Sequence, residues 1–135
     1  MGSPAETIAI LHEVAESRKS PASLVPLIAA TAVFHSPVMH TPQQGSDLVT
    51  QYLLAALKLF SQHDFHYVRK IVDGREAALE FVAEIDGIHV NGIDLISFDL
   101  EGKIIDFKVM IRPLQAIEVV RAKMLEQLQK AKGDH

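Results

Sequence analysis

The fold is decided by two runs, GIDLISF at residues 92–98 and GKIIDF at residues 102–107. Both are rich in apolar and β-branched residues, and the acidic segment 99–102 joins them, so they predict two antiparallel strands linked by a tight turn. Asp94 stands inside the first run, where a carboxylate costs free energy unless it is paired, neutral or used. The two runs therefore predict a small barrel-like sheet with a pocket.

The same alternation with a period of two continues on both sides of these runs. It predicts four strands, at residues 65–72, 76–85, 88–98 and 103–111. Asp73-Gly74 and Asp86-Gly87 are typical hairpin turns. In the second of the four strands one face is apolar, while Glu80 and Glu84 point the other way.

Helical stripes of apolar residues dominate the first half of the chain. They predict helices at residues 6–17, from Ser20-Pro21 onwards, from Ser46 to Phe60, and at 113–132. Ser20 and Ser46 suit the N-cap positions. A short strand is predicted at 31–34 and a loop at 39–45. Helices followed by a long antiparallel sheet indicate an α+β fold, in which a twisted sheet forms a cone with one open end.

Composition narrows the class of protein. A chain of 135 residues with 48% apolar residues fits a single domain with a real core. The net charge of -4 argues against nucleic acid or an anionic membrane surface as a partner. The first residues do not resemble a signal peptide, and no apolar run approaches the ~20 residues of a membrane span. A cytoplasmic protein is expected.

The order of elements resembles the nuclear transport factor 2-like superfamily, which includes SnoaL-like cyclases, limonene epoxide hydrolase and ketosteroid isomerase. The resemblance rests on VFHSPV at 33–38, GSD at 45–47, and the two runs that begin at Gly92 and Gly102. It implies a cystatin-like, cone-shaped curved sheet wrapped around N-terminal helices. Residues 1–135 would form a single SnoaL-like domain, with its core at about 6–112 and an added C-terminal helix at about 113–132.

Comparison with ketosteroid isomerase implies roles for three residues. Asp94 matches the aspartic acid that stays protonated there and donates a hydrogen bond to the substrate oxyanion. His12 falls where the isomerase has its oxyanion tyrosine. Ser36 falls where the isomerase has its aspartate base, and serine cannot replace that base alone. The steroid-isomerase route is therefore incompletely matched.

Each candidate residue has a simpler reading as well. Asp94 is either an acid at a cavity wall with a raised pKa, or a carboxylate tied to a backbone amide or a neighbouring side chain. His12 is either a donor or base facing Asp94, or a partly solvated histidine at a helix edge. Ser36, rather than His35, is expected to face inward, although a turn-forming Ser-Pro is favoured over a nucleophile. His40 lies in a loop that could fold over the mouth.

Large apolar side chains are expected to line or floor the cavity. They are Phe34, Tyr52, Phe81, Ile96, Phe107, Val109 and Ile111. An apolar pocket with one acid implies an apolar ligand that carries a carbonyl, hydroxyl or epoxide oxygen. The alternative is that these side chains fill the cone. No cofactor is expected, and no metal, because no pair of the seven histidines has helical ligand spacing backed by a carboxylate.

The outward face of the sheet carries alternating charges with an apolar residue among them. Its members are Glu80, Glu84, Asp106, Lys108, Met110 and Arg112. This pattern suits a homodimer closed by ion pairs, and the alternative is a solvated face. The last helix would pack on the partner or cover the cone.

The sequence thus favours an isomerase-, cyclase- or hydrolase-type enzyme that uses acid/base catalysis on a small apolar molecule. The alternative is a ligand-binding or protein-interaction module that does no chemistry.

Overall fold

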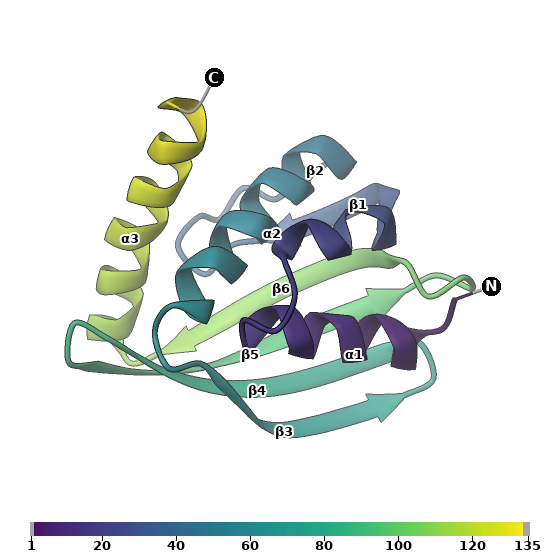
Figure 1. The fold of residues 1–135 in the computed structure, drawn as a ribbon, viewed down its shortest axis with the longest axis horizontal. Coiled ribbons are helices and arrows are strands. Elements are labelled where there is room, and N and C mark those ends of the chain that lie inside the picture. The colour runs from purple at the N-terminus through teal and green to yellow at the C-terminus, as the bar shows by residue number, and fades with distance from the viewer. Residues whose placement is uncertain (1, 134–135) are drawn as a thin grey trace.

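The computed structural model describes residues 2–133, with side chains up to residue 130. Helices and strands follow one another as the sequence predicts, with the long strands in the second half (Figure 1). In chain order the elements are α1 (Pro4–Ala15), η1 (Pro21–Leu27), β1 (Ile28–His35), β2 (Gln43–Gln44), α2 (Ser46–Ser61), β3 (His66–Asp73), β4 (Glu76–Ile85), β5 (Ile88–Phe98), β6 (Ile104–Arg112) and α3 (Leu114–Gly133).

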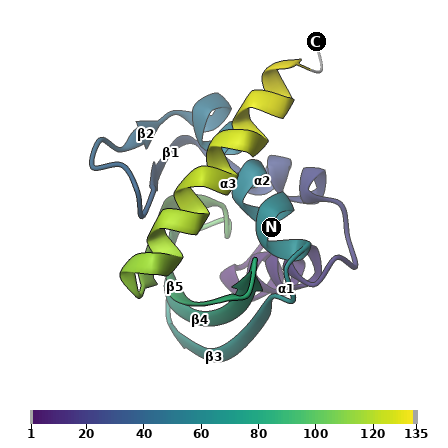
Figure 2. The same cartoon turned by 90° about the vertical axis from the view of Figure 1, so that its left-hand side faces the viewer.

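The strands form one six-stranded curved sheet in the order β2-β1-β6-β5-β4-β3. β1 runs parallel to β6, and all other neighbours in this sheet are antiparallel. The helices α1 and α2 lie on the concave side of the sheet (Figures 1 and 2). The predicted α+β fold, a curved sheet wrapped around N-terminal helices with an added C-terminal helix, is confirmed.

The hairpin of β4 and β5 has the bounds that the period-two pattern predicts. Its turn places Asp86 at φ 53° and Gly87 at φ 78°. Two successive left-handed residues produce a turn whose twist matches that of the flanking strands. The predicted inward residues of β4 are all buried, which confirms the register of the strand.

Gly92 allows close packing inside this hairpin. A Cβ atom at this position would lie 2.3 Å from the ring of Phe81 and 2.9 Å from the carbonyl oxygen of Met110. Because Phe81 is 1% exposed, its ring has no free space into which to move. Only glycine fits here.

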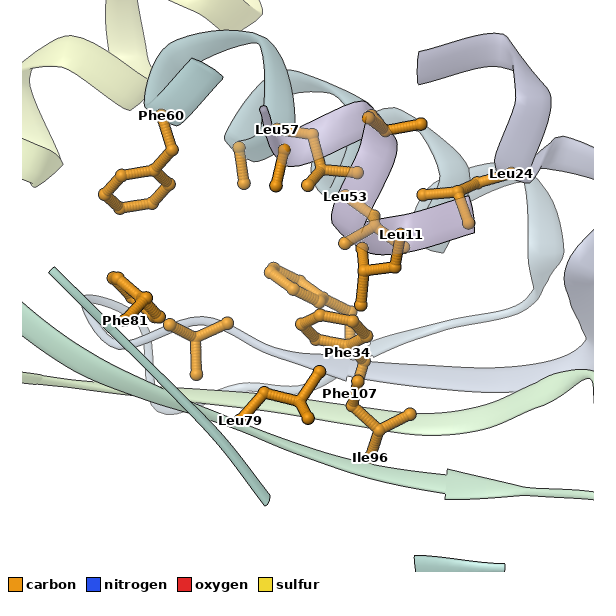
Figure 3. Packing of buried hydrophobic residues seen from close by; sticks show 14 of the residues in the cluster. Leu11, Leu24, Phe34, Leu53, Leu57, Phe60, Leu79, Phe81, Ile96 and Phe107 are labelled. Atoms are coloured by element: carbon orange, nitrogen blue, oxygen red, sulfur yellow. The ribbon is translucent and has the colours of Figure 1, made fainter. Parts of the chain in front are cut away.

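The core fills the space between the concave face and the helices (Figure 3). Aromatic rings occupy much of it, and Phe60, Phe65 and Phe81 contact one another with centroid distances of 4.9–5.6 Å. Phe34 from β1 packs on Phe107 from β6 at 6.0 Å. Offset and edge-to-face rings at such distances add to the stabilisation from burial.

The last helix, α3, is part of the same core. It packs along α2 and against the ends of β5 and β6 (Figure 2). Ala116, Val120 and Met124 on one face of α3 are buried, whereas Leu114 and Leu125 are exposed. The structure shows α3 covering the end of the cone, while its packing on a partner subunit stays a prediction.

The predicted short second helix is confirmed as a 3-10 helix, Pro21–Leu27, with Ser20 at its N-cap. Two other local predictions need correction. The predicted loop at 39–45 contains strand β2, because Gln43 and Gln44 pair with β1. Gly45, at φ 94°, occupies the N-cap of α2 instead of Ser46, and no side chain caps this helix.

Candidate active site

Asp94 lies in the middle of β5 with its side chain on the concave side of the sheet. Its neighbours across the strands are Leu79 of β4 and Val109 of β6, and all three are buried. Asp94 itself is only 6% exposed. The Asp94 carboxyl group is therefore buried within an apolar strand, as the sequence indicates.

The partner of this carboxyl group is Tyr67 on β3. The Tyr67 hydroxyl donates a hydrogen bond of 2.9 Å to Asp94 Oδ2. Burial raises the pKa of the Asp94 carboxyl from its ordinary 3.8 to about 7, and the hydrogen bond from Tyr67 opposes that rise. Burial, followed by the charge of Asp94, raises the pKa of the Tyr67 hydroxyl well above 10. Near neutral pH the pair therefore holds a protonatable acid beside a neutral phenol.

His12 lies next to Tyr67 rather than next to Asp94. The His12 and Tyr67 rings are 5.6 Å apart and tilted. Its ring nitrogens bond to other groups, Nε2 to Glu16 at 2.9 Å and Nδ1 to Lys70. His12 therefore has no hydrogen bond to Asp94, and Tyr67 contacts both residues. Of the two interpretations of His12, the structure shows the partly solvated histidine at a helix edge.

Tyr67 was absent from the residues that the sequence pointed to. A signal for it exists, because Phe65 and Tyr67 share one face of a strand with a period of two. Phe65 is buried and contacts the Tyr67 ring edge-on at 4.9 Å. The inward direction of Tyr67 could thus be predicted, but its partner two strands away could not.

Ser36 and His40 lie in another part of the molecule. The Ser36 hydroxyl accepts a hydrogen bond of 3.1 Å from the Val38 amide, so it stabilises the turn after β1. His40 is exposed. Both line a hollow of about 490 Å³ with Lys108 and do not join Asp94 there. His35 points to the outer side and bonds Asp106 at 2.9 Å.

The seven residues predicted to line a cavity are divided between the core and the surface. Five are buried in the packed interior, and these are Phe34, Phe81, Ile96, Phe107 and Val109. Tyr52 is half-buried and lines a pocket beside α3, while Ile111 borders two hollows on the outer side and edge of the sheet. Among the described residues, Asp94 lines none of five hollows on the surface of the protein.

The described residues are expected to hold no metal ion and no membrane span. Within residues 2–133, no three histidine, aspartate or glutamate side chains gather in a way that could hold a metal ion. No helix of the described chain is both long enough and apolar enough to cross a bilayer.

Comparison with known families places this site in context. Residues 10–107 match the SnoaL-like domain. The chain belongs to the SnoaL-like family. Within this family match lie Asp94, Tyr67, His12, Ser36 and His40, whereas α3 lies beyond it.

Solved structures similar to this SnoaL-like protein agree with its fold. A steroid delta-isomerase from Pseudomonas aeruginosa is 34% identical, with 96% of this chain and 94% of that chain covered and a TM-score of 0.86. An uncharacterised bacterial protein with a cystatin-like fold from Silicibacter pomeroyi is 29% identical, with coverage of 90% and 84% and a TM-score of 0.78. A putative SnoaL-like polyketide cyclase from Jannaschia sp., 13% identical with coverage of 88% and 92% and a TM-score of 0.65, shares the fold. A search of curated proteins found no match.

Proposed function

We propose that this SnoaL-like protein is an isomerase- or cyclase-type enzyme that uses Asp94 as a general acid on an apolar ligand bearing an oxygen atom. The observation that carries the proposal is the buried Asp94 carboxyl, which receives a hydrogen bond from Tyr67 and has a pKa near 7. A general acid works best when its pKa lies near the working pH. The similar steroid delta-isomerase supports the reaction class.

The chemistry follows from the two groups. Protonated Asp94 donates a hydrogen bond or a proton to an oxygen that gains negative charge, such as the oxygen of a ketone that becomes an enolate. The buried surroundings strengthen this interaction, because few water molecules compete for the charge. Tyr67 holds the carboxyl in place and remains a neutral donor.

Proton removal from carbon needs a separate base. His12 is proposed for this role, because its ring contacts Tyr67. Its Nε2 is bonded to Glu16, so Nδ1 would have to part from Lys70 before it accepts the proton. Its hydrogen bond to Glu16 fixes the orientation of the ring. Because neither Asp94 nor Tyr67 lines any of the five hollows, a ligand would reach Asp94 only after the Tyr67 ring has moved aside.

The test uses a panel of β,γ-unsaturated ketones, epoxides and polyketide fragments, with products followed by mass spectrometry and ultraviolet absorbance. Asp94→Asn retains the shape but cannot transfer a proton, so turnover should fall by roughly 100-fold or more. Glu84→Gln, an exposed carboxylate of β4, is the matched control and should keep full activity. Turnover that Asp94→Asn leaves unchanged would contradict the proposal.

A second candidate function is ligand binding without chemistry. The packed cone leaves no room for a ligand, since Phe34, Phe81 and Phe107 are each at most 2% exposed. The observation that favours this alternative is the hollow of about 240 Å³ beside Tyr52, which Asp94 does not line. Saturable binding of a panel compound without turnover, equal in the native protein and in Asp94→Asn, would support this alternative.

We also propose that the protein forms a homodimer through the outer face of the sheet. The centre of this face is apolar, with Ile71 58% and Met110 47% exposed around a hollow of about 340 Å³. Arg69, Glu80 and Arg112 line the same hollow, so both signs of charge are present and a second copy could match them.

The dimer is tested by light scattering after size-exclusion chromatography. Met110→Glu should yield monomers at concentrations where the native protein is dimeric. Leu100→Glu, which changes an 81% exposed residue in the turn before β6, is the control and should remain dimeric. A monomeric native protein would overturn this proposal.

A further inference from the structure

A pocket separate from Asp94 lies where α3 meets α2 and the turn after β1. We call it the α3 pocket, and its volume is about 240 Å³. It is lined by Ser36, Val38, Met39, Tyr52, Arg121, Met124, Leu125 and Leu128. Neither Asp94 nor Tyr67 lines it, so an occupant need not touch the proposed acid. α3 contributes half of these residues, and α3 lies beyond the family match.

The walls of the α3 pocket are mostly apolar and adaptable. Two methionines line it, Met39 from the turn after β1 and Met124 from α3. Thioether side chains fit ligands of irregular shape because they have several rotatable bonds and a polarisable sulfur. Leu125 is 54% and Met39 39% exposed, so apolar surface remains open to a ligand.

One charge borders this apolar surface. Arg121 is the sole ionisable lining residue apart from the Tyr52 phenol. Among the described residues Arg121 makes no ion pair, whereas Lys123 on the same helix pairs with Asp86 at 3.3 Å.

Two hydroxyl groups add polar contacts at the other side. Ser36 Oγ accepts from the Val38 amide, which leaves its own hydrogen free to donate. The Tyr52 hydroxyl belongs to a half-buried side chain whose ring packs 6.3 Å from Phe34. A guanidinium suits a carboxylate or a sulfate, and the two hydroxyl groups line the same pocket.

We infer that the α3 pocket binds a medium-chain amphipathic anion. Its chain lies against Met39, Met124 and Leu128, and its anionic group meets Arg121. The inference stands apart from the proposed enzyme, because it requires no chemistry at Asp94. It gives the added C-terminal helix a role in ligand binding as well as in covering the core.

The experiment is a titration with octanoate, and with octanol as the uncharged counterpart, monitored by the methyl resonances of the methionines. Octanoate should shift Met124 and Met39 in a saturable manner and leave Met110, on the outer face, unchanged. Arg121→Gln, an exposed substitution that folding should tolerate, should weaken octanoate binding roughly 3- to 10-fold and leave octanol unaffected. Lys130→Gln removes the same charge from an exposed site of α3 outside the pocket and serves as the control.

The outcomes separate this inference from the proposed function. Binding that Asp94→Asn preserves and Arg121→Gln weakens supports the α3 pocket, whether or not the protein proves to be an enzyme. The inference is overturned by the absence of a saturable Met124 shift below the concentration at which octanoate forms micelles. Equal binding of octanol and octanoate, or equal weakening by Lys130→Gln, would also overturn it.

Discussion

The Tyr67 hydroxyl donates its hydrogen bond to Asp94 across the intervening strand β4. Tyr67 is on β3, at the edge of the sheet, and Asp94 is on β5, in its interior. Because the sheet is curved, inward side chains from strands that are not neighbours can meet on its concave side. The bond makes the titration of the carboxyl dependent on the position of the ring.

The raised pKa of Asp94 predicts a specific dependence of stability on pH. Between about pH 4 and about pH 7 the unfolded chain has released this proton while the folded chain retains it. The free energy of unfolding should therefore fall as the pH rises through that window and level off above it. The rise of the pKa from 3.8 to about 7 corresponds to roughly 4 kcal/mol.

The measurement is urea unfolding of the native protein and of Asp94→Asn at several values between about pH 4 and pH 8. The difference between the two isolates the contribution of Asp94, since other carboxylates titrate in both. Parallel profiles for the native protein and Asp94→Asn would show that the carboxyl has an ordinary pKa.

Tyr67→Phe should raise the pKa of Asp94 further. Its hydroxyl bonds the carboxyl and favours the ionised form, so its loss leaves burial unopposed. The variant should also lose about 1 kcal/mol of stability. Carbon-13 NMR titration of the Asp94 carboxyl measures the pKa, with Tyr52→Phe as the matched control. A pKa that drops toward 4 would mean that burial is not the main cause.

Gly92→Ala should destabilise the protein by about 1–3 kcal/mol, because the new methyl group overlaps the ring of Phe81 and the Met110 carbonyl. Phe81→Leu in the same chain should recover part of the loss. A double-mutant cycle measured by thermal unfolding tests this. Strictly additive effects of the two substitutions would show that the Phe81 ring is not the obstacle.

Val120→Ala should cost about 1–2 kcal/mol, because Val120 on α3 is 1% exposed and its truncation leaves a cavity in the core. Leu114→Ala, at a site that is 69% exposed on the same helix, should change stability by no more than about 0.5 kcal/mol. Chemical unfolding of both variants decides whether α3 belongs to the core. Equal effects would indicate a helix that is only loosely attached.

Much of the architecture is encoded locally. The alternation in residues 76–98, together with the Asp86-Gly87 turn, predicts the β4–β5 hairpin with its observed bounds, since the side-chain period of a strand is a local property. The apolar stripe of α2 likewise predicts the helix. The local predictions failed where the conformation of a residue depends on strand pairing. Gln43 and Gln44, for example, form a strand only because β1 lies beside them.

The candidate site likewise combines a feature that the sequence determines with others that only the tertiary structure decides. The sequence by itself determined that Asp94 stands inside an apolar strand, where a carboxylate is costly unless it is paired or neutral, and the structure shows this side chain buried. Tertiary structure alone decided that Tyr67 is its hydrogen-bond donor, that His12 stands behind that ring, and that Ser36 lies apart from both. These relationships depend on the curvature of the sheet and on how α1 packs across it. Both arise from contacts between segments far apart in the chain, which no local pattern records.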